Sequence, residues 1–472
     1  MSSISSALSS LLSSSSSSSS SIDLSSILEA ALGASSPGID VTAAVNSAVT
    51  AAEAPETAWQ NQLSTLQSQA SDINQIQSDV SNLDSDAQAL NSITGPLSAR
   101  TVSSSNSGVV TASAASGSTP GNHVVVVNSL ATTSSWASGV FASSTTALPA
   151  GSFTVTTGSG ATTITTDGTE TLTDVANQIN GDNLGLTASV VTDATGSRLA
   201  IVANSSGSAA NFTVTGNAGF GFTQAATGQN ASLTVDGIGI SSASNTVTGA
   251  VPGLTLNLQS ANPGTQISLS VQQDTSGAST AINQFVTDYN KVITDLNTEF
   301  TYTSGSGQGP LATDSTVRSL QSSVLGVLSY TYTPGSGTTT VPNLTSLGIS
   351  VNNDGTLTVD SSTLQSVLQN NFGDVQSFFQ GTSLNGFANS LDQTLTSFTD
   401  PSNGAFTVDL QSISNQETDL NNDITNFQTN YITPLKTQLQ NDYSQAEIAL
   451  QELPNEMKQI SEELGQNSSS NG

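Results

Sequence analysis

Apolar residues recur at helical spacing towards both ends of this chain. From Trp59 to Leu90 the steps between apolar positions alternate between four and three residues, with one phase shift on the way. A seam of this kind predicts a long amphipathic helix whose apolar stripe is covered by other helices. Pro55 fits the first turn of this helix, and Gly95 with Pro96 predicts its end.

A second set of heptad-like positions begins at Leu410 and continues to Leu464. Pro434 and Pro454 lie inside it. We expect a kink or a break at each, because an interior proline costs about 3 kcal/mol in a helix. The simplest partner for one terminal seam is the other seam. We therefore expect the two ends of the chain to pack together, with everything between them as an insertion.

The apolar positions of the two seams are our candidates for partner binding. Each such side chain is worth roughly 1.5–3 kcal/mol when it is buried. Seams that a single chain covers only in part would drive self-assembly. The candidate positions are Trp59, Leu63, Leu66, Ile73, Val80, Leu83, Leu90, Ile424, Phe427, Tyr431, Leu450, Leu453, Ile460 and Leu464.

The middle of the chain has the alternation of half-buried strands. Residues 101–271 are rich in Thr, Val, Ser and Gly, and Asp167-Gly168 and Asp236-Gly237 are hairpin signals among them. The stretch Thr171–Asn180 has helical spacing instead, and Thr171 or Thr173 is its expected N-cap. A further apolar stripe over residues 282–300 predicts another helix.

The stretch "ISVNNDGTLTVD", residues 349–360, has two readings. An EF-hand loop with Gly355 at its sixth position would place Ser350 at position 1 and Ser361 at position 12. Charged oxygen ligands are missing at both places, which argues against a calcium site. Asp354-Gly355 between alternating apolar residues favours a type I′ hairpin instead.

These patterns predict an α+β multidomain protein. Terminal helices form a coiled-coil or helical-bundle leg, and nested, β-rich, antiparallel head domains are inserted between them. The family resemblance given below implies a finer division: a disordered Ser-rich extension, residues 1–37; terminal leg helices, 38–55 and 431–472; a helical-bundle domain with a small hairpin, 56–103 and 277–430; a β-rich head domain, 104–147 and 230–276; and a second inserted β-rich domain, 148–229.

Composition removes several classes of function. The 472 residues include 35 acidic and only 6 basic side chains, for a net charge of −29, so the chain is not suited to bind nucleic acid or anionic lipid. With so few basic residues, protonating the carboxylates leaves little positive self-repulsion, which suits an acidic habitat. No cysteine is present, which excludes disulfides and thiolate chemistry.

Catalytic chemistry has little support in the sequence. The single histidine, His123, stands beside a run of valines and is interpreted as a strand-edge residue. No nucleophile-elbow motif occurs, and although carboxylate pairs for glycoside hydrolysis are compatible with the composition, no motif indicates one. We expect no enzyme activity, no cofactor and no metal.

The N-terminus does not have the features of a cleaved export signal. The first basic residue is Arg100, so a basic n-region is missing, and no apolar run approaches the length of a membrane span. We therefore expect a protein that stays inside the cell or leaves by a route that needs no such signal.

Five stretches resemble one family, the filament cap proteins of bacterial flagella, also called hook-associated protein 2. "GIDVTAAVNSAVTAAEAPETAW" from Gly38 is similar to the family's N-terminal region, and "TLTDVANQINGDNLGLTASVV" from Thr171 looks like its hook IN motif. "SNTVTGAVPGLTLNLQS", "FVTDYNKVITDLN" and "LGISVNNDGTLTVD" resemble its middle and C-terminal parts. One departure is that 37 residues, nine of them a serine run, precede Gly38.

The resemblance implies a structural protein and not an enzyme. Members of the family are exported unfolded by the flagellar type III apparatus and form a homo-oligomeric ring, commonly a pentamer, at the extracellular tip of the filament. Their terminal helices act as legs, and their β-rich domains form a plate that retains flagellin and promotes its folding and insertion. The implied partners are further copies of the chain, flagellin, filament and hook–filament junction proteins, and a cognate export chaperone.

A surface adhesin or stalk that binds host glycan or mucin is the alternative. Ser- and Thr-rich β domains suit cell adhesion as well as they suit a cap plate in cell motility. An adhesin, however, does not need heptad segments at both ends of the chain.

Overall fold

The computed structural model of the chain describes residues 40–468 apart from 217, 218, 306 and 336. The predicted Ser-rich extension, residues 1–37, lies outside the described residues. The chain divides into two compact units. Of the described residues, the terminal unit takes in those within 40–78, 296–319 and 397–468, and the central unit takes in those within 79–295 and 320–396.

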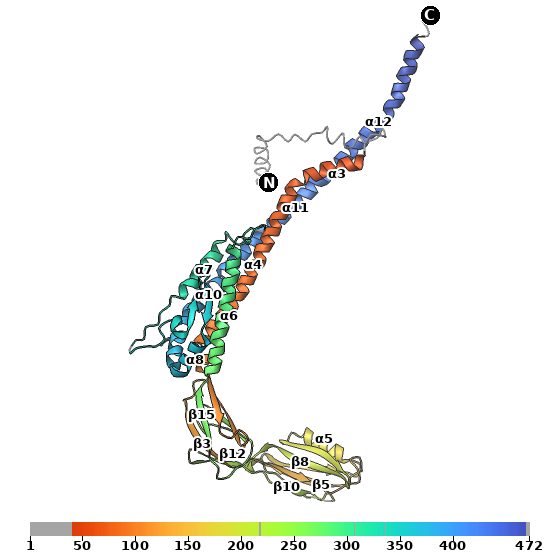
Figure 1. The fold of residues 1–472 in the computed structure, drawn as a ribbon. Coiled ribbons are helices and arrows are strands. Elements are labelled where there is room, and N and C mark those ends of the chain that lie inside the picture. The colour runs from red at the N-terminus through yellow and green to blue at the C-terminus, as the bar shows by residue number, and fades with distance from the viewer. Residues whose placement is uncertain (1–39, 217–218, 306, 336, 469–472) are drawn as a thin grey trace. The chain divides into compact units, whose positions relative to one another are not determined.

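Helices from both ends of the chain meet in the terminal unit. In Figure 1, α3 lies along α12, and Val45 and Val49 of α3 are buried with Ile432 in one apolar cluster. Asp40 caps α3 by accepting a hydrogen bond from the Ala43 N–H at 2.9 Å. The elements with residues in this unit include α3 (Val41–Ala52), α4 (Ala54–Asn91), α11 (Ala405–Phe427), η4 (Gln428–Ile432) and α12 (Thr433–Ser468).

The two prolines of the C-terminal seam affect the helix differently. Residues Gln428–Ile432 form a π-helical turn directly before Pro434. The wider turn relieves the clash between a proline ring and the preceding carbonyl groups. The chain stays helical through Pro454, where we expected a kink or a break, because a proline removes only one hydrogen bond from a helix that keeps the others.

The helical part of the central unit is built on an aromatic core. Phe387 is buried against Phe285, Phe378, Phe379 and Tyr330, with ring centroids between 5.3 and 6.1 Å from its own. The helices that contribute residues to this unit include α4, α6 (Thr275–Phe300), α7 (Ser315–Val327), α8 (Ser361–Asn370), α9 (Phe372–Gln380) and α10 (Phe387–Thr399), with the short turns η1 (Pro96–Ser98) and η3 (Leu344–Leu347).

The predicted hairpin at residues 349–360 is confirmed, but its predicted turn type is wrong. A type I′ turn needs positive φ at both central residues, and here only Gly355 has it, at +85°. The Asn352 N–H donates to the Thr356 carbonyl across a three-residue loop, and the Asp354 carboxylate accepts from the Thr356 N–H. The Tyr289 hydroxyl donates to the Gly355 carbonyl at 3.1 Å, which fixes the turn on α6. The two strands are β16 (Ile349–Val351) and β17 (Leu357–Val359).

Antiparallel sheets occupy the rest of the central unit and form two separate apolar cores. A five-stranded sheet, in the order β1-β15-β3-β11-β12, shares one core with a three-stranded sheet, in the order β13-β14-β2. Their strands are β1 (Arg100–Ser104), β2 (Val110–Ala114), β3 (Gly121–Ser129), β11 (Ala231–Val235), β12 (Ile238–Ser242), β13 (Thr246–Thr248), β14 (Leu254–Leu258) and β15 (Ile267–Gln273).

The second core lies between a four-stranded sheet, β10-β4-β8-β7, a three-stranded sheet, β6-β5-β9, and helix α5. The Thr171 side chain caps α5 and pairs with Asp174 in a capping box, so the helix begins where the spacing predicted. The elements are β4 (Thr133–Ala137), β5 (Gly151–Thr157), β6 (Gly160–Thr166), α5 (Leu172–Gly181), β7 (Leu186–Asp193), β8 (Gly196–Ser206), β9 (Thr213–Thr215) and β10 (Thr223–Ala226).

One Asp-Gly signal in this region is right and the other is wrong. Asp236 and Gly237 have φ of 51° and 83° and join the pair Val235–Ile238, as a type I′ hairpin requires. Asp167-Gly168 instead connects β6 to α5. There the Asp167 carboxylate accepts hydrogen bonds from the N–H and hydroxyl of Thr169, which holds a loop before the helix.

His123 lies in a strand, as the sequence predicted, and at this position β3 is paired with β15 alone. It lies near the start of β3, which pairs with β15 on one side and β11 on the other. Its Nδ1 lies 2.8 Å from Oδ2 of Asp236, whose other oxygen accepts the Val124 N–H. The histidine therefore helps to fix a hairpin turn. The predicted fold class, terminal helices with antiparallel β-rich domains between them, is confirmed.

Candidate functional site

An aromatic ladder joins the two terminal seams. The Trp59 ring meets Phe427 edge to face at 5.4 Å, and Phe427 stacks on Tyr431 at 5.2 Å. Beside them the Gln428 amide donates to the carboxylate of Glu56, which is 8% exposed. Residues from the two ends of the chain thus share one packed interface, as the seams predicted.

The first seam is covered inside the folded chain. Trp59 and Leu63 are half-buried. The other predicted positions are buried: Leu66, Ile73, Val80, Leu83 and Leu90. Because these side chains are already packed, they hold the single chain together, and their binding to a second chain stays a prediction.

The second seam is covered only in part. Ile424 and Phe427 are half-buried, whereas Tyr431 is 52% exposed and Leu450 38% exposed. Ile448, which falls outside the heptad positions and was missed for that reason, is 57% exposed. We call these three exposed positions, Tyr431, Ile448 and Leu450, the leg surface; Ile448 and Leu450 are two residues apart and therefore point to different sides of α12. The side chains of the remaining predicted positions lie outside the described residues: Leu453, Ile460 and Leu464.

Two pairs of carboxyl groups lie between helices of the central unit. Asp84 of α4 faces Asp392 of α10, and Gln88 donates to both, at 3.0 Å each. Asp86 of α4 faces Asp288 of α6. Burial raises the pKa of Asp84 and of Asp86 to about 7, and the neighbouring carboxyl group acts in the same direction in each case. No sequence pattern indicated these pairs, because a single Asp residue on a polar helix face is ordinarily solvent-exposed.

A cation lies close to these pairs. The Lys291 amine donates to Oδ1 of Asp79 at 2.5 Å, and the Asp79 side chain is 1% exposed. This hydrogen bond raises the pKa of Lys291. The buried Asp79 charge is therefore matched by a base, unlike the two carboxyl pairs.

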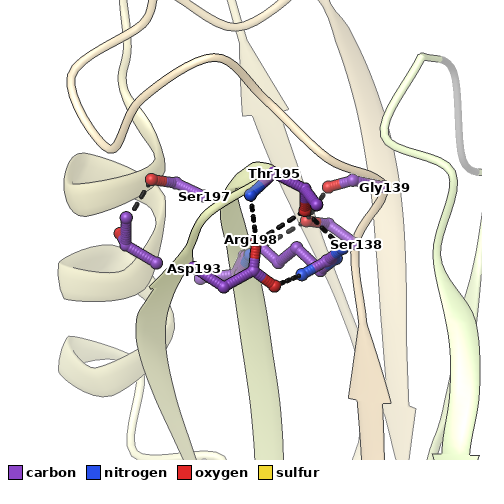
Figure 2. Close-up of polar contacts among 8 residues, drawn as sticks. Ser138, Gly139, Asp193, Thr195, Ser197 and Arg198 are labelled. Carbon is purple, nitrogen blue, oxygen red and sulfur yellow. Dashed lines mark hydrogen bonds and ion pairs between the residues drawn. The ribbon is translucent and has the colours of Figure 1, made fainter.

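The β7–β8 hairpin carries a separate polar cluster, drawn in Figure 2. The Asp193 carboxylate accepts hydrogen bonds from the Thr195 hydroxyl at 2.5 Å, from the Arg198 guanidinium, and from the Thr195 N–H at 2.7 Å. These hydrogen bonds, with Thr195 contributing most, hold the pKa of Asp193 well below its usual range. The Ser138 hydroxyl accepts the Leu199 N–H at 2.9 Å, which ties β4 to β8. The cluster fixes the hairpin tip and offers no nucleophile paired with a base.

The described residues offer no obvious site for a metal or a membrane. Among them, no three His, Asp or Glu side chains are placed to hold a metal ion together. None of the helices in this part of the chain is both long enough and apolar enough to cross a bilayer.

Comparison with known proteins decides the family. Residues 37–134 match the model of the flagellar hook-associated protein 2 N-terminus, residues 228–458 match its C-terminus, and residues 152–205 match the flagellin hook IN motif. The B-type flagellar hook-associated protein 2 of Pseudomonas aeruginosa is 30% identical over 340 residues, covering 64% of this chain and 70% of that one. The chain belongs to the flagellar hook-associated protein 2 family.

A further relative and a solved structure align with other shares of the chain. The Campylobacter jejuni flagellar hook-associated protein 2 is 35% identical over 164 residues, which is 32% of this chain and 25% of that protein. The crystal structure of the D1-D2-D3 domains of the flagellar cap protein FliD from Escherichia coli aligns with a TM-score of 0.60 over 73% of this chain and 99% of that one. At 24% identity this likeness shows a shared fold. The family resemblance noted in the sequence is confirmed.

Proposed function

We propose that this chain caps the distal end of a bacterial flagellar filament, outside the cell, as a ring of identical copies. In this role it retains exported flagellin subunits and promotes their folding and insertion. Membership of the hook-associated protein 2 family supports the proposal, as does the fold shared with a structure described as a flagellar cap protein. The role is structural and not enzymatic.

The observation that carries the proposal is the unequal coverage of the two seams. The first seam is packed inside the chain, while the leg surface on η4 and α12 leaves Tyr431, Ile448 and Leu450 exposed. Apolar positions that one chain leaves exposed on a leg helix become buried when further helices pack around it. The leg surface is therefore where we place contacts with neighbouring copies and with the filament.

Further partners follow from the resemblance. They are the filament and hook–filament junction proteins and a cognate chaperone that keeps the chain competent for export. We assign the predicted seam positions beyond Leu450 to the same contacts. The adhesin alternative finds no support, because the relatives described above are all hook-associated proteins of flagella.

A charge on the leg surface should impair motility without unfolding the chain. The Ile448→Asp, Leu450→Asp double variant is expressed in a strain that lacks its own cap protein. We expect this strain to swim less than one that expresses the parent chain, because burying a carboxylate in a protein contact costs several kcal/mol. Light scattering of the purified variant should show weaker self-association than that of the parent chain.

The matched control is Val351→Asp on β16, a valine that is 52% exposed and lies outside the β-rich head domains. It should leave both self-association and swimming close to the parent. Equal swimming by the leg variant and the control would contradict the role of the leg surface, and a parent chain that stays monomeric at high concentration would contradict the ring.

A further inference from the structure

Each carboxyl pair of the central unit has one glutamine beside it and no paired base. Gln88 donates to Oδ2 of Asp84 and to Oδ1 of Asp392. In the other pair, the Gln284 amide donates to Oδ2 of Asp288 at 2.9 Å. Two ionised carboxylates that face each other repel, and the neutral glutamine amide cannot cancel their charge.

One carboxyl oxygen in each pair lacks a hydrogen-bond donor. Oδ1 of Asp84 and Oδ2 of Asp86 are buried, and neither has a hydrogen-bond partner among the described groups. A buried carboxylate oxygen without a partner is costly. A protonated carboxyl group removes this cost, because its O–H donates to the carboxylate that it faces.

Among the described residues, no basic side chain forms a salt bridge with either pair. On α6, Lys291 binds Asp79, and its charge also acts on Asp288 and Asp295. Asp274 lines the same hollow as Asp86, which adds a further negative charge on that side. On α10 the facing acid is Asp392, and Asp84 contacts that carboxyl group and Gln88. The surroundings therefore favour a proton over a second charge.

We propose that each carboxyl pair holds one shared proton in the folded chain, and that losing these protons in alkaline medium loosens the helices of the central unit. Asp84 and Asp86 carry the protons. Asp392 and Asp288 accept the hydrogen bonds, and their remaining oxygens are held by the glutamine amides.

The sign of the pH effect follows from the direction of the shift. In the folded chain the pKa of Asp84 and Asp86 is about 7, against an ordinary value of 3.8. The folded chain thus binds more protons than the unfolded chain between these values, and its stability falls as pH rises. The stabilisation is complete below 3.8 and is lost as pH rises through about 7.

Helix melting at several pH values tests the proposal. In a His123→Gln background, in which the chain has no histidine, the parent should melt roughly 5 °C lower at about pH 8.5 than at about pH 6. Asp84→Asn with Asp86→Asn mimics the protonated groups, so its melting temperature should barely change over that range. At about pH 8.5 this variant should melt above the parent.

Asp419→Asn, an exposed change on α11, is the matched control and should keep the parent's pH dependence. The Asp392→Asn, Asp288→Asn double variant changes the other carboxyl group of each pair. It should also remove the pH dependence of the melting temperature, and it provides a second test if the first variant folds poorly. The infrared carbonyl band of protonated carboxyl groups should disappear near neutral pH in the parent chain. A parent with flat melting and no such band, or Asn variants with the parent's slope, would overturn the proposal.

Discussion

Replacing Phe387 by alanine should lower the free energy of unfolding of the central unit by about 3–5 kcal/mol. The Phe387 side chain is 1% exposed and meets four other aromatic rings, so its removal leaves a cavity that those rigid rings cannot fill. Aromatic pairs of this kind add stability beyond the area that they bury. Urea unfolding followed by circular dichroism of the helices measures the loss.

Val351→Ala is the control for this variant. Val351 belongs to β16 in the same unit but is 52% exposed, so its change should stay within about 0.5 kcal/mol of the parent. A Phe387→Ala variant that loses less than about 1 kcal/mol would show that the aromatic core does not hold these helices together.

Removing residues 431–472 should abolish swimming when the truncated chain replaces the cap protein of a motile strain. The deletion takes away Ile432, which buries Val45 and Val49 of α3, and it removes Tyr431 from the aromatic ladder. The terminal unit then loses both its internal packing and its leg surface. Swimming and filament length in the complemented strain are the measurements.

The fold of the truncated chain needs its own measurement. The sheets and the aromatic core lie in the central unit, so their melting transition should be retained. Filaments of normal length from a secreted, truncated chain would contradict the need for the terminal helices. If the truncated chain lacks the melting transition of the central unit, its swimming defect would instead result from misfolding.

The sequence predicted helices and strands better than it predicted contacts between residues that are distant in the chain. The heptad spacing of Trp59–Leu90 and the capping signal at Thr171 each gave a helix at the right place, because periodicity and capping act over a few residues. The same two letters, Asp-Gly, gave a type I′ hairpin at residue 236 and a loop before a helix at residue 167. Which one forms depends on whether a strand or a helix follows.

Two features of the candidate site were beyond such patterns. Asp84 meets Asp392 across residues that are remote in sequence, so neither shows its partner in the local composition. Ile448 is exposed because of where α3 and α12 meet, although its residue type alone favours burial. Tertiary packing determines both the Asp84–Asp392 contact and the exposure of Ile448, and local sequence patterns do not predict tertiary packing.

The nesting of the sheets sets an order of folding. Strand β1 pairs with β15, with Arg100 opposite Gln273, so this sheet closes only after the whole segment between them is present. The β7–β8 hairpin inside that segment needs only neighbouring residues. Local contacts form faster than distant ones, so a chain that emerges unfolded should fold from its innermost insertion outwards. Pulsed hydrogen exchange during refolding should protect β7 and β8 first and α3 last, and simultaneous protection would show that the chain folds as one unit.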